Sequence, residues 1–211
     1  MSFLSGRESY ERSELHESGV DPDPLLQLGQ WVRDAEQAQI SEHNAMCVSS
    51  VNLSGQPSSR MVLLRGLDSR GLIFYTSYFS RKGRELTENP NVAALFYWRK
   101  LERQARIEGV VSQLSDGESD AYFATRPRGH QLGAWASEQS EPVESRELLD
   151  RRIDDYNSRF DGEDVPRPHS WGGYLIKPFR IEFWQGRPNR MHDRIEYTTH
   201  GHTWTHQRLQ P

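Results

Sequence analysis

Residues 60–84, R-M-V-L-L-R-G-L-D-S-R-G-L-I-F-Y-T-S-Y-F-S-R-K-G-R, contain the pattern that decides the fold. An apolar run at residues 61–64 and a second run at 72–76 flank a D-S-R-G turn at 68–71. Short apolar runs on either side of a tight turn are typical of paired antiparallel strands. The stretch therefore predicts two neighbouring strands of an antiparallel sheet.

The polar end of this stretch predicts a short helix with an unusual charge. Ser80 is a good N-cap, and Asn89-Pro90 ends the helical pattern. Arg81 and Lys82 fall in the first turn, where the helix dipole disfavours cations. A phosphate bound to the free N–H groups of that turn would account for them. The alternative is a solvated helix start that happens to be basic.

The charge balance of the chain excludes some classes of partner. The 211 residues carry a net charge of −4. Residues 1–24 contain six acidic and two basic residues, so the rest of the chain is balanced. General binding to nucleic acids or anionic membranes needs a basic excess, which is missing here. Cys47 is the only cysteine, which excludes an internal disulfide and a CxxC redox pair.

The remaining pattern predicts a mainly β (α+β) fold with peripheral helices. Residues 1–22 are expected to form a flexible segment, and 23–211 a single domain. Helices are expected from Asp23-Pro24, from the capping box at Ser115 and over 144–160, with a loop at 128–142. Further strands are expected at 44–51, 91–98, 102–114, 171–176, 180–185, 190–197 and 203–209. Six to eight mostly antiparallel strands indicate a β-barrel.

Several kinds of chemistry are not supported by the sequence. It has no G-x-G-x-x-G after a strand, no P-loop, no H-E-x-x-H and no G-x-S-x-G. His200, His202 and His206 surround a glycine and polar residues, so a metal site is not favoured. No run reaches the length of a membrane span, and the start lacks a signal-peptide core, so a soluble cytoplasmic protein is expected.

Arg, Lys, Tyr, Gln and Trp residues at strand ends suit a planar, phosphorylated cofactor. The alternative is that Trp98, Trp171 and Trp184 belong to the core.

Seven motifs together resemble one known family. They are R-M-V-L-L-R at 60–65, Y-T-S at 75–77, S-R-K at 80–82, E-R-Q at 102–104, Y-F-A-T-R-P-R at 122–128, Q-L-G-A-W-A-S-E-Q-S at 131–140 and E-F-W-Q-G-R-P-N-R-M-H-D-R at 182–194. The chain resembles the pyridoxamine 5′-phosphate oxidase family from about residue 7 to its end. The resemblance implies an FMN-binding split barrel that works as a homodimer in vitamin B6 metabolism.

The resemblance also implies a cofactor site shared by two subunits. On one subunit FMN would contact Arg60, Met61, Val62, Leu63, Leu64, Tyr75, Thr76, Arg81, Lys82 and Gln104. From the other subunit it would be reached by Gln139, Ser140, Trp184 and Arg194. The basic helix start described above would then be the anchor of the flavin phosphate.

The substrate residues implied by the resemblance fall into two groups. The substrate phosphate would be bound by Arg65, Tyr122, Arg126 and His130. Arg190, Met191 and His192 would face the pyridine ring, and Arg190 and His192 would be catalytic. Arg65 stands where the family commonly has Lys, and His130 where its best-known members have Ser. A protonated His130 donates best to phosphate, so these departures bear on substrate preference.

The implied activity is oxidation of pyridoxamine or pyridoxine 5′-phosphate at C4′, with O2 as acceptor and H2O2 as product. FMN would accept the hydride equivalent, and the protein would orient the substrate and hold its phosphate. One alternative is a related split-barrel flavin oxidase of phenazine biosynthesis. Another is a non-catalytic protein that binds flavin or pyridoxal phosphate.

Overall fold

The computed structural model describes residues 9–201 and 203–211. Its strands are β1 (Ala45–Val51), β2 (Pro57–Leu63), β3 (Gly66–Asp68), β4 (Gly71–Ser77), β5 (Asn91–Trp98), β6 (Arg103–Gln113), β7 (Trp171–Gln185), β8 (Asp193–His200) and β9 (Thr203–Arg208). Its α-helices are α1 (Pro24–Gln37), α2 (Arg81–Glu88), α3 (Asp116–Ala124), α4 (Arg128–Ala136) and α5 (Arg146–Arg159). None of these helices is both long and apolar enough to cross a bilayer.

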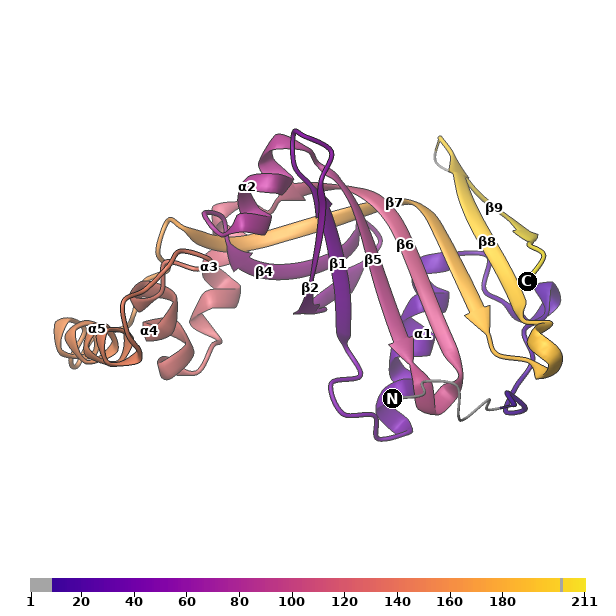
Figure 1. Ribbon diagram of the computed structural model, residues 1–211, viewed down its shortest axis with the longest axis horizontal. Coiled ribbons are helices and arrows are strands. Elements are labelled where there is room, and N and C mark those ends of the chain that lie inside the picture. The colour runs from indigo at the N-terminus through magenta and orange to yellow at the C-terminus, as the bar shows by residue number, and fades with distance from the viewer. Residues whose placement is uncertain (1–8, 202) are drawn as a thin grey trace, which may run out of the picture.

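All nine of these strands belong to one antiparallel, curled sheet, which confirms the expected fold class (Figure 1). The order is β2-β1-β5-β6-β7-β4-β3, and β8 and β9 extend the sheet from β7. The two strands predicted from residues 60–84 are β2 and β4, although they are not hydrogen-bonded neighbours in the sheet. The turn between them instead joins β3 to β4, with Gly71 at φ 144°, a backbone conformation that favours glycine.

Strand β7 is shared by two parts of the sheet. Its first half pairs with β4, where Thr76 is opposite Gly172, and its second half pairs with β8, where Trp184 is opposite Arg194. Strand β6 pairs with β7 from Tyr174 to Gln185, along its other edge. The sheet therefore divides at the middle of β7. Strands β4 and β3 continue it next to the first half of β7, and β8 and β9 continue it next to the second half (Figure 1).

The prediction of separate strands at 171–176 and 180–185 is wrong, because one strand of 15 residues spans both. Proline cannot donate to the ladder, so Pro178 requires an adjustment of the strand pairing. In the structure Pro178 is opposite Gly109, at a shift of register between Glu108 and Gly109. Such a bulge absorbs the missing hydrogen bond and lets the strand continue.

The core lies between the sheet and α1. Asp23 caps this helix by accepting a hydrogen bond from the Leu25 N–H, as predicted. Trp31 of α1 is 2% exposed and packs edge-on against Phe183, with ring centroids 4.9 Å apart. Trp98 is also buried in this core, and its ring lies 6.2 Å from that of Trp31. Burial of several large aromatic residues is the main stabilising contribution here.

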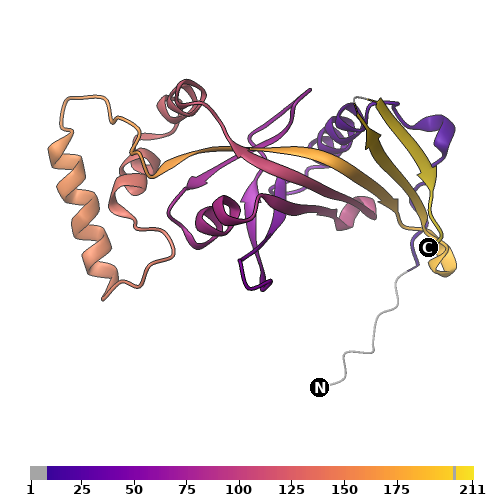
Figure 2. The ribbon, with the colours of Figure 1, turned by 90° about the horizontal axis from the view of Figure 1, so that it is seen from above.

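The helices between β6 and β7 gather at one end of the molecule (Figure 2). The predicted capping box at Ser115 opens α3. The prediction of a loop at 128–142 is wrong, since α4 covers Arg128–Ala136. Leu132 of α4 packs with Phe123 and Trp171 in a second, smaller core, and this tertiary contact supports a helix whose sequence has weak periodicity.

The expected flexible segment, residues 1–22, falls into two parts. Residues 1–8, including Arg7, lie outside the described residues. In the remainder, Leu15 is buried and its N–H donates to Asp193 at 3.1 Å. Glu17 pairs with Arg208 of β9 at 2.7 Å. Residues 9–22 therefore contact the C-terminal strands.

Candidate functional site

The first group of candidate residues, which we call the α2 cluster, surrounds the start of α2. Its members are Ser50, Ser58, Arg60, Thr76, Arg81, Lys82, Glu85 and Gln139. They come from β1, β2, β4, α2 and the segment after α4. Ser80 caps α2 by accepting from the Gly83 N–H at 3.2 Å, which confirms the predicted N-cap.

Lys82 is a buried cation, and no ion pair links it to a carboxylate in residues 9–201 and 203–211. Its Nζ donates to Thr76 Oγ1 at 2.9 Å and to Gln139 Oε1 at 3.1 Å. Burial, together with the nearby positive charge of Arg60, lowers the pKa of Lys82 to about 8. A buried charge needs compensation, and neutral oxygens supply only part of it. The environment of Lys82 therefore fits an anionic ligand.

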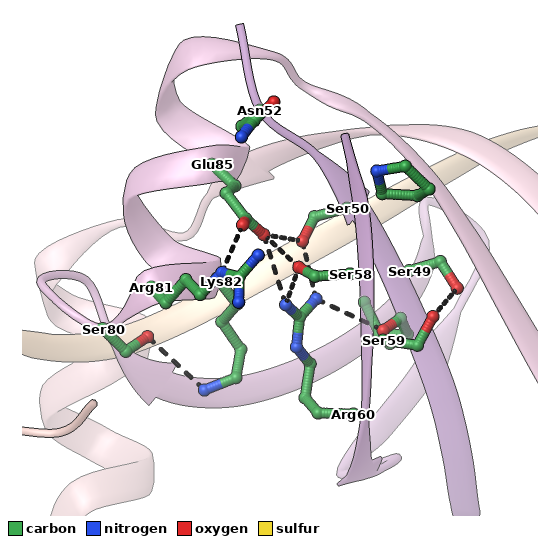
Figure 3. A network of polar contacts seen from close by, with 12 residues as sticks. Ser49, Ser50, Asn52, Ser58, Ser59, Arg60, Ser80, Arg81, Lys82 and Glu85 are labelled. Carbon is green, nitrogen blue, oxygen red and sulfur yellow. Dashed lines mark hydrogen bonds and ion pairs between the residues drawn. The ribbon is translucent and has the colours of Figure 1, made fainter. Parts of the chain in front are cut away.

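Glu85 forms ion pairs with the other two cations of the α2 cluster, Arg60 and Arg81 (Figure 3). Its Oε1 accepts from Arg81 Nε at 2.9 Å, and its Oε2 from Arg60 Nη2 at 3.2 Å. Oε2 also accepts from the hydroxyls of Ser50 and Ser58, at 2.5 and 2.6 Å. Burial alone would raise the pKa of Glu85, but these four hydrogen bonds outweigh it and lower the pKa to about 2. Glu85 is therefore ionised at neutral pH.

A second group, the aromatic cluster, is built around Tyr75 of β4. The rings of Tyr75 and Tyr122 stack at 3.7 Å, and Trp171 stacks on Tyr75 at 5.4 Å. The guanidinium of Arg126 lies over Trp171, 4.4 Å from the ring centroid. Tyr75 and Thr76 are consecutive in β4, so the aromatic cluster and the α2 cluster are built on the same part of this strand, with their β4 side chains on opposite faces.

Within the aromatic cluster, Arg126 has a buried hydrogen-bond donor that a ligand could satisfy. Its Nη1 is buried and has no hydrogen-bond partner within the described part of the chain. Burial and the nearby Arg65 lower the pKa of Arg126, although Tyr122 opposes this shift. A buried donor without a partner is costly. An anion held between Arg126 and the exposed Arg65 would satisfy it. His130 is exposed on the first turn of α4, and its side chain shows no hydrogen bond to this cluster in the described chain.

A third group forms a hollow of about 1030 Å³ near the C-terminus, the C-terminal pocket. It is lined by Ser9, Tyr10, Leu95, Tyr97, Gln104, Trp184, Arg187, Asn189, Arg190 and His192. The rings of Trp184 and His192 lie 4.6 Å apart, and Tyr10 packs against both at 5.8 Å. Gly186 allows this approach, because a Cβ there would lie 2.7 Å from the Tyr10 ring.

His192 is held in one orientation within the C-terminal pocket. The backbone N–H of Arg187 donates to its Nδ1 at 3.1 Å, so the neutral ring carries its proton on Nε2. Burial and then Arg190 lower the pKa of His192, with Asp193 partly opposing them. The neutral ring is therefore favoured at pH 7, and its Nε2–H is a hydrogen-bond donor.

Arg190 precedes β8 instead of beginning it, so the predicted strand start at 190 is wrong. Residues 188–190 form a short 3-10 turn, and β8 starts at Asp193. Asn189 and Arg190 have φ values of 56° and 62°, in the left-handed region. Such backbone conformations cost about 1–3 kcal/mol each and occur often at functional sites. The turn leaves the Arg190 and Met191 side chains exposed at the rim of the pocket.

Arg194 lies outside the lining of this pocket and is fully occupied in its own chain. Its Nε and Nη2 donate to the two oxygens of Glu182 at 2.8 and 3.0 Å, and its Nη1 donates to Gln210 O at 2.8 Å. The hydrogen bonds that Arg194 donates to Glu182 raise the pKa of Arg194. A flavin contact from Arg194 would therefore require part of this arrangement to change.

The structure changes the expected division of the cofactor residues in two places. Gln139 was expected to act from the other subunit, but it contacts Thr76 and Lys82 of its own chain. Gln104 was expected beside these residues, but it is the cross-strand partner of Trp184 and lines the C-terminal pocket.

The apolar residues expected at the flavin differ in exposure. Met61 is exposed, Val62 and Leu63 are half-buried, and Leu64 is buried. Ser140 follows Gln139 as an exposed residue with φ 77°.

The α2 cluster and the C-terminal pocket lie toward opposite ends of β7 (Figure 1). Thr76 is paired with Gly172, and Gln104 with Trp184. Twelve residues of strand separate these two β7 positions, which corresponds to roughly 40 Å along the strand. Thr76 and Trp184 of one chain are therefore far apart along β7.

Sequence reasoning did not single out Glu85, and it did not identify Trp171 as the ring on which the Arg126 guanidinium lies. The spacing of Arg81 and Glu85, four residues apart on a helix, was the available signal for the first. No local signal pairs Trp171 with Arg126, because 45 residues separate them. Tyr10 of the N-terminal segment also contacts the C-terminal pocket, through Trp184 and His192.

Comparison with known proteins agrees with this geometry. Residues 32–160 match the family model described as pyridoxamine 5′-phosphate oxidase. Residues 171–211 match the pyridoxine 5′-phosphate oxidase C-terminal dimerisation region. A pyridoxine/pyridoxamine 5′-phosphate oxidase of Rubrobacter xylanophilus is 57% identical over 205 residues, covering 97% of this chain and 94% of the relative. One from Burkholderia mallei is 53% identical and covers 91% and 89%.

Two solved structures share the fold. PhzG from Burkholderia lata, in complex with tetrahydrophenazine-1-carboxylic acid, superposes with a TM-score of 0.88 at 32% identity, over 93% of this chain and 98% of that one. A pyridoxamine 5′-phosphate oxidase-related, FMN binding protein from Nostoc punctiforme has a TM-score of 0.73 at 14% identity, over 91% and 100% of the two chains. The second likeness concerns the fold alone.

Proposed function

The chain belongs to the pyridoxamine 5′-phosphate oxidase family, and we propose that it is an FMN-dependent oxidase that converts pyridoxamine or pyridoxine 5′-phosphate to pyridoxal 5′-phosphate. O2 is the proposed electron acceptor and is reduced to H2O2, and with the amine substrate water is also consumed and ammonia is released. The family assignment rests on the matches over most of the chain. The cofactor, acceptor and substrate are inferred from the residues of the site.

The observation that carries this proposal is a pair of candidate anion sites built on consecutive residues of β4. Lys82 beside Thr76 is a buried cation without a carboxylate partner in the described chain, and Arg126 beside Tyr75 has a buried donor without a partner there. Two phosphates, one on the cofactor and one on the substrate, would provide an anionic partner for Lys82 and for Arg126. Phosphate carries three strong acceptor oxygens, so it can bind several such donors at once.

The proposed enzyme is a homodimer with both subunits at each site. The C-terminal pocket supplies Trp184, Gln104 and His192, but it lies far along β7 from the α2 cluster of the same chain. A second copy can bring its pocket to the α2 cluster of the first. The match of residues 171–211 to a dimerisation region supports this arrangement.

The side chains of the chain would mainly bind and orient. When bound, FMN would supply a two-electron acceptor, which no protein side chain provides. Lys82 and Arg81 would hold its phosphate, while Arg126 and Arg65 would hold that of the substrate. Fixing both phosphates would place the reacting atoms at a constant distance, which lowers the entropic part of the barrier.

His192 and Arg190 would orient the pyridine ring from the partner's pocket. With its proton on Nε2, His192 can donate a hydrogen bond to a ring substituent. Accepting a proton from the amino or hydroxyl group on C4′ would require loss of the bond from the Arg187 N–H, so we assign orientation to His192. The cation of Arg190, on the exposed turn, can stabilise negative charge on a ring oxygen.

An absorbance spectrum and an oxygen-electrode assay test the proposal. The protein reconstituted with FMN should be yellow, and it should consume O2 and release H2O2 with pyridoxamine or pyridoxine 5′-phosphate. The same assay with tetrahydrophenazine-1-carboxylic acid distinguishes a phenazine-type oxidase. A yellow protein that consumes no O2 with any of these substrates would be a binding protein, and a protein that binds no FMN would refute the proposal.

A further inference from the structure

Arg81 occupies an unusual position in the α2 cluster. Its side chain is 57% exposed, yet one donor, Nε, is held by the buried carboxylate of Glu85 at 2.9 Å. Its two terminal nitrogens have no hydrogen bond to other residues in the described chain. An exposed arginine normally samples many rotamers. Here the Nε contact restricts the guanidinium and leaves both terminal nitrogens for a ligand.

Arg60 is in the opposite situation, because its terminal nitrogens are committed to the protein. Nη1 donates to Ser50 Oγ at 2.6 Å and to Val48 O at 3.3 Å. Nη2 donates to Ser58 Oγ at 2.6 Å and to Glu85 at 3.2 Å. Arg60 and the two serines therefore fix the Glu85 carboxylate from the strand side, as Figure 3 shows.

We propose that Glu85 is a positioning residue for phosphate binding, holding the Arg81 guanidinium so that its terminal nitrogens can donate to the ligand. This inference rests on the proposed function, because the ligand is the phosphate of FMN. Glu85 does not itself contact the phosphate. It acts through Arg81, and it is kept in place by Arg60, Ser50 and Ser58.

The charge of the cluster is compatible with this role. Arg60, Arg81 and Lys82 bring three positive charges, and Glu85 brings one negative charge. The net charge of about +2 matches a phosphate monoester, which carries about −1.5 to −2 at pH 7. The carboxylate is thus already compensated within the protein, so its repulsion of the ligand is small compared with the order it imposes on Arg81.

Two substitutions separate position from charge. Glu85→Gln keeps the length of the side chain, but an amide cannot accept hydrogen bonds from all four donors. Glu85→Asp keeps the charge, but the shorter side chain withdraws the carboxylate from Arg81 Nε. We expect FMN to bind about tenfold more weakly to Glu85→Gln and about fivefold more weakly to Glu85→Asp. The dissociation constants are measured by quenching of flavin fluorescence on the apoprotein.

Riboflavin, which lacks the phosphate, separates loss of phosphate binding from general damage to the fold. General damage would weaken riboflavin binding as well. Its affinity should change less than twofold in both variants. Glu88→Gln, at the exposed end of the same helix, is the matched control and should leave the FMN affinity unchanged. In an Arg81→Ala background, Glu85→Gln should have little further effect on FMN, because Glu85 acts through Arg81.

Several outcomes would overturn the inference. They are an unchanged or tighter FMN affinity in Glu85→Gln, an unchanged affinity in Glu85→Asp, an equal loss of riboflavin binding, or additive effects of Glu85→Gln and Arg81→Ala. If Glu85→Gln does not fold, Glu85→Asp decides the question alone, and if neither folds the role of Glu85 is structural. A wild-type protein that binds no FMN would instead refute the proposed function.

Discussion

Two clusters of arginine and glutamate on the same sheet are balanced differently. In the α2 cluster one carboxylate, Glu85, pairs with Arg60 and Arg81, and the third cation, Lys82, has no carboxylate partner in the described chain. On the outer face of β6, β7 and β8 each guanidinium has a carboxylate partner, in a group that we call the C-terminal ladder. Its members are Arg106, Arg180, Arg194, Glu108, Glu182 and Glu196.

The difference shows where positive charge exceeds negative charge within the protein. In the C-terminal ladder the charges cancel, so the ion pairs connect strands and need no ligand. In the α2 cluster the excess charge is partly buried at Lys82, whose lowered pKa reflects the cost of that burial. Excess buried charge is destabilising without a ligand and favours binding of an anion. Four experiments can contradict or refine this contrast.

The largest effect is expected for Lys82→Met, which removes the buried charge. The FMN affinity should fall about 100-fold, because charge-assisted hydrogen bonds contribute about 1.5–3 kcal/mol each and 1.4 kcal/mol is a factor of ten. The apoprotein should be as stable as the wild type or more stable, since an unfavourably buried cation is removed. Fluorescence titration and urea denaturation measure the two quantities. Lys177→Met, on an exposed position of β7, is the control and should change neither.

Arg81→Ala should weaken FMN binding by about one to two decades on the same energy scale. Arg84→Ala is the matched control on the same helix, since Arg84 pairs with Glu141 at the surface. The control should change the FMN affinity by less than twofold. Equal affinities of wild type and Arg81→Ala in a flavin titration would show that the α2 cluster does not bind the phosphate.

The pH dependence of FMN binding should be about tenfold between pH 7 and pH 9. Lys82 of the apoprotein has its pKa lowered to about 8, so it is protonated below that pH and increasingly neutral above it. Binding of the phosphate needs the ammonium form, and the affinity therefore falls as the pH rises through 8. A Lys82→Arg variant stays charged and should give a flat profile. Riboflavin titrations correct for ionisation of the flavin ring, and a flat wild-type profile would contradict the role of Lys82.

The smallest effect is expected for Arg106→Ala in the C-terminal ladder. Glu182 keeps its two bonds to Arg194 after this change, so no buried carboxylate is left unpaired. The FMN affinity should change less than twofold and the free energy of unfolding by less than about 1 kcal/mol. A loss of FMN binding comparable to that of Lys82→Met would show that the contrast between the clusters is wrong.

Local patterns predicted much of the fold. The caps at Asp23, Ser80 and Ser115 mark helices that begin where predicted, because a cap is decided by a few consecutive residues. The break predicted between residues 176 and 180 is absent, because a register shift on β6 opposite Pro178 lets β7 continue. The missed helix α4 depends on packing of Leu132 against Phe123 and Trp171, which are distant in sequence or outside the helix.

The candidate site was predictable in its residue types but not in its grouping. Motif resemblance named Gln104 and Gln139, yet only strand register and the path after α4 show which cluster each one joins. Glu85 escaped notice because its partners Ser50 and Ser58 come from two other strands. Contacts between segments far apart in the chain are the part that local patterns do not encode.

The placement of the α2 cluster and the C-terminal pocket at opposite ends of β7 has a genetic consequence for the proposed dimer. A Lys82→Met chain and a Trp184→Ala chain would each form inactive homodimers. A mixed dimer of the two would place both defects in one site and leave the other site wholly wild type. Co-expression of two inactive alleles should therefore restore up to half of the activity per mixed dimer, whereas two defects in the same cluster should not complement.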